Sequence, residues 1–118
     1  MEQQETIVDK SHLLLKYSIP ILNRLPRSQK FVLGDRIQNL SSDLLEVLIE
    51  AFYESVIAAK QTLLRKANII LEKLRHYWRL GYELGYYGSG QLGEVSQRLL
   101  EIGRMVGGWL NSFKNNKS

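Results

Sequence analysis

Apolar residues recur along four stretches of this chain at spacings of three, four or seven residues, which places them on one face of an α-helix. The stripe nearest the C-terminus comprises Leu92, Val95, Leu99, Ile102, Val106, Trp109 and Phe113. The earlier stripes are Ile7, Leu14, Tyr17 and Ile21, then Leu33, Ile37, Leu40, Leu44, Leu48, Phe52 and Val56, then Leu63, Ala67, Ile70, Leu74, Tyr77, Gly81 and Leu84. No stretch alternates with the period of a β-strand. The pattern therefore predicts an all-α protein.

Turn-forming residues divide the chain into four predicted helices, at residues 6–25, 29–59, 61–84 and 91–113. Pro20 lies inside the first helix, and its missing N–H predicts a kink near residues 16–18 or an early end there. Pro26 interrupts the helical pattern, and Ser28 is a candidate N-cap for the second helix. The glycine-rich stretch 85–90 is the clearest turn signal.

The second helix is long, and Ser41-Ser42 followed by Asp43 could start a new helix. Because the stripe continues in phase across these residues, we expect one continuous helix. Short connections between long amphipathic helices favour antiparallel neighbours. The 118 residues are thus expected to form one domain, an antiparallel up-down-up-down four-helix bundle.

The sequence holds no cysteine, which excludes disulfides, thiolate metal sites and a cysteine nucleophile. No window approaches the roughly 18 apolar residues that a membrane span needs. We therefore expect a cytoplasmic protein that does not enter a membrane.

Positive charge is concentrated in the second half of the chain. Residues 1–60 hold seven Lys and Arg against eight Asp and Glu, whereas residues 61–118 hold nine against four. Such asymmetry favours an anionic partner. The candidate nucleic-acid-binding residues are Arg65, Lys66, Lys73, Arg75, His76, Arg79, Arg98 and Arg104. The alternative interpretation is an ordinary solvated helix surface.

Aromatic residues accompany these cations, and arginine both pairs with phosphate and stacks on bases. They are Tyr77, Trp78, Tyr82, Tyr86 and Tyr87. Tyr77 falls in the apolar seam of its helix, and Trp78 beside it is expected to pack in the core as well.

The second helix carries an acidic face formed by Asp43, Glu46, Glu50 and Glu54. We expect this face to be solvated. The alternative is a docking surface for a basic patch on a neighbouring subunit.

Glycines interrupt the last helix at Gly103, Gly107 and Gly108, although each lowers helix stability by up to about 1 kcal/mol relative to alanine. Gly103 and Gly107 are one turn apart and form a smooth strip that another helix could approach closely. Together with Trp109 they are predicted to serve packing, within the bundle or between subunits.

Residues suited to catalysis are scarce. His12 and His76 belong to no Glu-x-x-His pair, so we expect no metal and no cofactor. The stretch 88–90 is expected to be an interhelix turn rather than a phosphate site. Glu72, Glu83 and Glu101 suit surface ion pairs better than acid–base chemistry. The sequence therefore predicts a protein that is not an enzyme.

Two segments carry a family resemblance: residues 74–80, LRHYWRL, and residues 100–110, LEIGRMVGGWL. They resemble the accessory variability determinant proteins of diversity-generating retroelements, a four-helix-bundle family related to proteins encoded in ribosomal RNA intervening sequences. The resemblance is best over residues 60–113 and weak over the first helix.

The resemblance implies a homopentameric ring with a basic surface. It also implies association with the element's reverse transcriptase and with its template RNA, or possibly DNA, during the error-prone cDNA synthesis that diversifies a target gene. By position, Arg75, Arg79 and Arg104 match motif arginines, and Gly103, Gly107, Gly108 and Trp109 match the motif of the last helix.

Three functional hypotheses follow. The first is a non-catalytic accessory subunit that bridges a reverse transcriptase and its RNA. The second is a ring-forming scaffold of the intervening-sequence type without specific nucleic-acid binding. The third, an enzyme with a site at subunit junctions, is disfavoured by the missing nucleophiles and ligands.

Overall fold

Four long helices form the body of the protein in the computed structural model, which describes residues 2–115 and, of their side chains, those of residues 6–114. They are α1 (Glu2–Asn23), α3 (Asp35–Tyr53), α4 (Ile57–Glu83) and α5 (Ser89–Asn115). A short helix α2 (Arg27–Gln29) and a π-helical segment η1 (Lys30–Gly34) connect α1 to α3. No strand occurs between residues 2 and 115. The predicted all-α class is confirmed.

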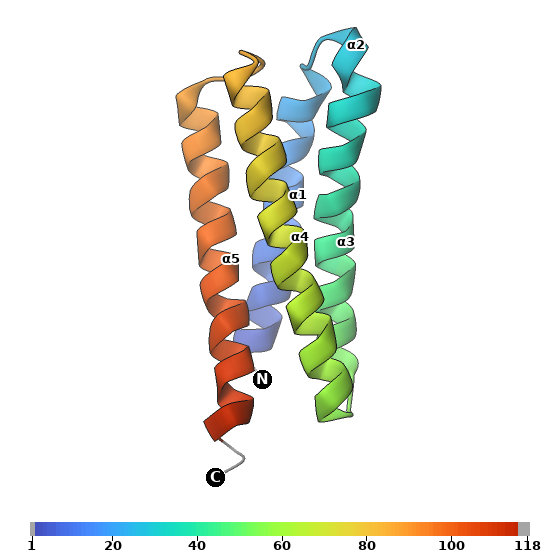
Figure 1. The fold of residues 1–118 in the computed structure, drawn as a ribbon, viewed down its shortest axis with the longest axis vertical. Coiled ribbons are helices and arrows are strands. Elements are labelled where there is room, and N and C mark those ends of the chain that lie inside the picture. The colour runs from blue at the N-terminus through green and yellow to red at the C-terminus, as the bar shows by residue number, and fades with distance from the viewer. Residues whose placement is uncertain (1, 116–118) are drawn as a thin grey trace.

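The helices alternate in direction along the chain, so that α1 and α4 run opposite to α3 and α5 (Figure 1). Each packs on two neighbours: α3 and α5 both contact α1, and both also contact α4. The result is an elongated antiparallel bundle of 51 × 22 × 20 Å, in which the start of α1 and the end of α5 lie toward the same end. Within the described residues, no helix is both long enough and apolar enough to cross a membrane.

The apolar stripe of α5 forms one wall of the core, as predicted. Val95, Ile102 and Val106 are fully buried, and Trp109 is nearly so. On α4 the predicted seam is partly wrong, because Tyr77 is only half-buried whereas Trp78 is fully buried. The buried face of α4 is centred on Leu64, Ala67, Leu71, Leu74 and Trp78, so the helix is rotated relative to the predicted seam.

Helix α1 continues through Pro20 to Asn23, so the early end considered for it is wrong. The proline is exposed, which leaves the carbonyl that has lost its hydrogen-bond partner on the water-facing side of the helix. Ile21 and Leu22 beyond it are buried and hold the last turn against the core.

The start of the second predicted helix differs from expectation. Ser28 does not cap it, because Pro26 occupies the N-cap position of α2 and no side-chain capping bond forms. Regular α-helix begins only at Asp35, after the π-helical segment. A side chain at Gly34 would lie 3.2 Å from Leu25 Cδ1, so the glycine allows the segment to pack closely against the end of α1.

Helix α3 passes through Ser41 and Ser42 without interruption, which confirms the prediction of one helix there. Ser41 is buried, and its hydroxyl donates to the Ile37 carbonyl at 2.8 Å instead of capping a new helix.

The boundary between α3 and α4 lies at residues 54–56, not near residue 60 as predicted. Lys60 Nζ donates to the carbonyl of Ala51 at 2.6 Å and to that of Phe52 at 3.4 Å. The backbone N–H of Val56 donates to Glu54 Oε2 at 3.1 Å. These contacts fold the chain back six residues earlier than the apolar stripe indicated, and they leave Val56 exposed.

The turn between α4 and α5 lies where the glycines predicted it. Gly85 adopts a positive φ of 82°, which a side chain would strain. Tyr87 folds back onto α4, where its hydroxyl donates to the Trp78 carbonyl and its ring lies over Gly81. A Cβ atom at Gly81 would overlap that ring, so the glycine is required for the close approach.

Candidate nucleic-acid interface

Helices α4 and α5 pack side by side and share one face of the bundle. Arg75 reaches from α4 across α5, where a Cβ atom at Gly103 would lie 3.0 Å from Arg75 Nη2. Gly103 therefore makes room for a guanidinium group within the chain. Gly103 thus lies at a contact between α4 and α5.

The two motif arginines of α4 already pair with carboxylates of their own helix. Arg75 Nη1 lies 3.0 Å from Glu72 Oε1, and Arg79 Nε lies 3.9 Å from Glu83 Oε2. His76 Nε2 lies 3.5 Å from the second oxygen of Glu72. These groups are exposed or half-exposed, so the pairs are weak and readily exchanged for other anions.

The glutamates that were expected to form surface ion pairs do so. Glu72 and Glu83 are described above, and Glu101 Oε1 lies 3.3 Å from Lys10 Nζ of α1. The last pair ties α5 to α1 on the side of the bundle away from α4.

Four of the candidate cations are exposed and have no ion pair among the described residues. They are Arg65, Lys66, Lys73 and Arg104. Their charge is available to an anionic partner.

The candidate residues do not form one continuous face. Arg98 turns toward α1, where its guanidinium lies 4.9 Å from the centre of the Tyr17 ring and its Nε 2.8 Å from Glu94 Oε2. Lys66 and Lys73 lie on the side of α4 that faces α3. They share a helix face with Thr62, which lines a hollow together with Glu50 and other residues of α3.

Arg65 and Arg75 lie where α4 meets α5. Helical spacing places three further members of the predicted set on the same α4–α5 face, namely His76, Arg79 and Arg104. A flat partner surface that contacts these residues cannot also contact Lys66 and Lys73 on the α3 side or Arg98 on the α1 side. The sequence could not separate these groups, because the side on which a cation lies depends on which helices neighbour its own.

A groove of about 420 Å³ runs between α4 and α5, toward the end of the bundle at which α5 ends. Its lining residues are Gln61, Arg65, Gly107, Leu110, Asn111 and Lys114. Gln61, Asn111 and Lys114 were not singled out from the sequence. Their helical spacing offered a signal, since Gln61 lies one turn from Arg65 and Gly107 lies one turn from Asn111.

Trp109 is buried within the chain's own core, 4% exposed. Lys60 Nζ lies over its ring at 5.4 Å from the ring centre. Trp109 therefore anchors α5 to the junction of α3 and α4. Gly107 and Gly108 contribute differently from Gly103, since Gly108 is exposed and a Cβ atom at Gly107 would meet nothing within 4 Å.

The acidic face of α3 is solvated, as expected. Asp43, Glu46 and Glu50 are exposed and form no ion pair within the described part of the chain, and Glu54 is half-buried by its bond to Val56.

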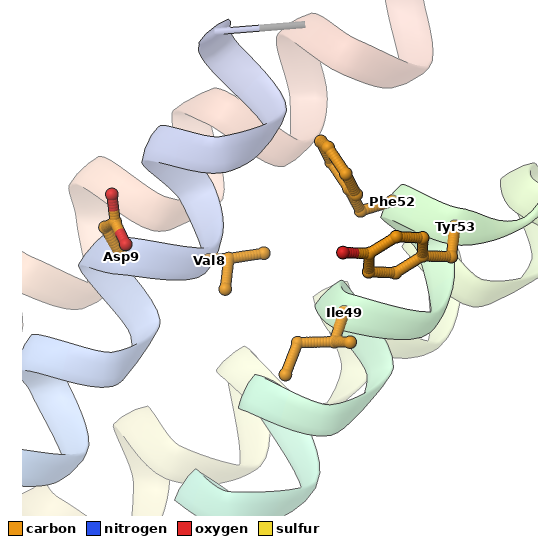
Figure 2. Close-up of a pocket in the computed structure, with 5 residues that line it drawn as sticks. All are labelled: Val8, Asp9, Ile49, Phe52 and Tyr53. Atoms are coloured by element: carbon orange, nitrogen blue, oxygen red, sulfur yellow. The ribbon is translucent and has the colours of Figure 1, made fainter.

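Another hollow, of about 490 Å³, lies between α1 and α3 (Figure 2). Val8 and Ile49 point into it beside the Tyr53 ring, whereas the carboxylate of Asp9 points away from the ring. Tyr53 is 79% exposed. The lining is mostly apolar, and the Asp9 carboxylate and the Tyr53 hydroxyl are its polar groups, so the hollow suits contact with an apolar surface rather than chemistry.

Tyr87 lines neither the groove nor these hollows. Burial raises the pKa of the Tyr87 phenol, which serves the turn after α4. Within the described residues, no group of three or more histidine, aspartate or glutamate side chains could hold a metal ion.

The fold and this surface define a class: a four-helix bundle with a charged α4–α5 face and glycines in the last helix. A model of the bAvd-like family matches residues 5–113, nearly the whole chain. The protein belongs to the bAvd-like family and is an accessory protein of the accessory variability determinant (Avd) type. No curated protein matches its sequence.

Proposed function

We propose that this protein is a non-catalytic accessory subunit of a diversity-generating retroelement. It binds the element's reverse transcriptase and the template RNA, or the cDNA, and supports mutagenic reverse transcription in the cytoplasm. The observation that carries the proposal is the α4–α5 face of this Avd-type bundle. On it, Arg65 and Arg104 lie near Arg75 and Arg79 and form no ion pair with any described carboxylate.

The ion pairs of Arg75 and Arg79 are compatible with this role. An exposed pair of this kind contributes at most about 1 kcal/mol, so a phosphate can replace the carboxylate without a large loss of stability. Glu72 and Glu83 then hold the guanidinium groups in place before the nucleic acid arrives. Arginine is suited to such exchange because its planar fork fits phosphate as well as carboxylate.

Assembly into a homo-oligomer, a pentameric ring by analogy with the family, belongs to the same proposal. A ring repeats the formal charge of +4 per chain and so strengthens the field that attracts nucleic acid. Subunit contacts are then available to the acidic face of α3, whose carboxylates at Asp43, Glu46 and Glu50 form no ion pair among the described residues.

Reversing the charge of Arg75 and Arg79 together (R75E/R79E) tests the RNA-binding part. We expect template RNA to bind at least tenfold more weakly at low salt, because counterion release on phosphate binding depends on the cations that meet the phosphates. Fluorescence anisotropy with labelled template RNA measures the affinity, and circular dichroism checks that the bundle remains folded.

The matched control is K16E/R36E, which changes the net charge equally on exposed residues of α1 and α3. This variant is expected to bind RNA within about threefold of the unaltered protein. Equal losses in both variants, or no loss in R75E/R79E, would remove these arginines from the RNA-binding surface.

A ring-forming scaffold of the intervening-sequence type is the second candidate. The pairing of Arg75 and Arg79 with glutamates of their own helix favours it, because those cations are already satisfied in the isolated chain. A scaffold would bind template RNA and unrelated RNA of the same length with equally weak affinity. Competition between these two RNAs distinguishes the candidates.

A further inference from the structure

The groove between α4 and α5 is lined by groups that suit a phosphate. Arg65 of α4 and Lys114 of α5 contribute positive charge, and Gln61 and Asn111 contribute side-chain amides. No carboxylate lines the groove, in contrast to the surroundings of Arg75 and Arg79 further along the same face.

All four polar side chains are available to a ligand. None of Gln61, Arg65, Asn111 or Lys114 makes an ion pair or a side-chain hydrogen bond within the described residues. Guanidinium, ammonium and amide N–H groups are all donors, and phosphate oxygens only accept. The donor set is therefore complementary to a phosphate and not to a cation.

Packing within the chain does not explain why position 107 in the groove is a glycine. A glycine inside a helix lowers stability by up to about 1 kcal/mol relative to alanine. Gly103, one turn earlier, has a structural reason, because Arg75 lies against it. At Gly107 a Cβ atom would meet nothing within 4 Å, so the missing side chain keeps space open between Arg65 and Lys114.

We propose that this groove is a phosphate-binding subsite that holds the sugar–phosphate backbone of the nucleic acid, with Arg65 and Lys114 as its cations and Gly107 as its floor. The inference rests on the proposed RNA-binding function and adds the position and chemistry of one contact. Gln61 and Asn111 donate to the same phosphate oxygens from the two helices.

Two kinds of variant test the groove with labelled template RNA. R65Q/K114Q removes the charge, and we expect at least tenfold weaker binding at low salt. Because each phosphate contact on a single strand contributes about 0.7 to the slope of log affinity against log salt, that slope should fall by about 1.4. G107L fills the groove without changing charge and is expected to weaken binding at least fivefold.

Matched controls separate the groove from general effects. K16Q/R36Q removes one lysine and one arginine from α1 and α3, and G93L adds the same leucine at an exposed glycine of α5 outside the groove, where a Cβ atom would meet nothing within 4 Å. Both are expected to bind RNA within about twofold of the unaltered protein. Circular dichroism and size-exclusion chromatography establish that each variant is folded and in the same oligomeric state.

The outcomes distinguish this inference from the function on which it rests. If the unaltered protein binds no RNA at low salt, the proposed function and the groove both fall. If it binds and R65Q/K114Q and G107L bind equally well, only the groove is refuted. A change of oligomeric state in G107L with unchanged RNA affinity would assign the groove to a second copy of the chain and also overturn the inference.

Discussion

The Tyr87 hydroxyl links the turn after α4 to the body of that helix. It donates to the Trp78 carbonyl, and the tyrosine is only 8% exposed. Burial raises the pKa of this phenol above its ordinary value of 10.0. The folded protein therefore holds the phenolic proton to higher pH than the unfolded chain does.

The sign of the resulting pH dependence follows from linkage. A group whose pKa is raised on folding contributes its full stability below the unfolded value, and this contribution is lost as pH rises above about 10. At neutral pH we expect Tyr87→Phe to lower the free energy of unfolding by about 1 kcal/mol, because the Trp78 carbonyl loses its donor. By pH 11 the difference should shrink by about 1 kcal/mol.

Urea unfolding of both proteins between pH 7 and 11 measures this difference. Tyr82→Phe is the control, because Tyr82 is 40% exposed. The free energy of unfolding of this variant should change with pH in parallel with that of the unaltered protein. A constant gap between Tyr87→Phe and the unaltered protein across this range would show that Tyr87 ionises normally in the fold.

Single residues also mark where sequence pattern succeeded and where it did not. The burial of Trp78 was expected beside the seam, yet it displaces Tyr77 as the aromatic core residue of α4. Periodicity alone could not fix the helix rotation, because Tyr77 and Trp78 are adjacent and both are large. The rotation of α4 is fixed by the close contact between Tyr87 and Gly81, which only the folded turn after α4 brings together.

At the scale of elements, Lys60 holds three helices together. Its ammonium group donates to the carbonyls of Ala51 and Phe52 at the end of α3, and it lies over the Trp109 ring of α5. A cation at a helix C-terminus interacts favourably with the exposed carbonyls and with the helix dipole. Lys60 itself lies in the first turn of α4.

Lys60→Met keeps the aliphatic stem and removes the charge. We expect the free energy of unfolding to fall by about 1 kcal/mol, because the α3 carbonyls lose a charged donor. Lys66→Met on the same helix is the control and should stay within about 0.5 kcal/mol, since Lys66 is exposed and has no ion pair among the described residues. Urea denaturation gives both values, and equal effects would contradict the role assigned to Lys60.

The existence of the four helices was predictable because each has a continuous apolar face. Their ends were less so. The break before Ile57 depends on Lys60 reaching back to α3, and the late start of regular helix at Asp35 depends on Gly34 packing against Leu25. Both contacts join residues that only the fold brings together.

At the scale of the whole molecule, the described cations of α4 and α5 are divided among three sides of the bundle. Arg98 faces α1 and Lys66 and Lys73 lie toward α3. The α4–α5 face carries Arg65, Arg75, Arg79, Arg104 and Lys114. The sequence correctly indicated which residues carry the charge, but the neighbours of each helix decide where that charge lies. The same geometry creates the groove at Gly107, which residue pattern did not reveal.

The central claim is that this Avd-type protein joins a reverse transcriptase to its RNA. Purifying the tagged protein from its native host at low salt, followed by identification of the bound protein and RNA, tests it most directly. The account predicts recovery of a reverse transcriptase together with one structured RNA, and loss of that RNA from the R75E/R79E variant. Recovery of the protein alone, as a ring or a monomer, would contradict the claim and favour the scaffold.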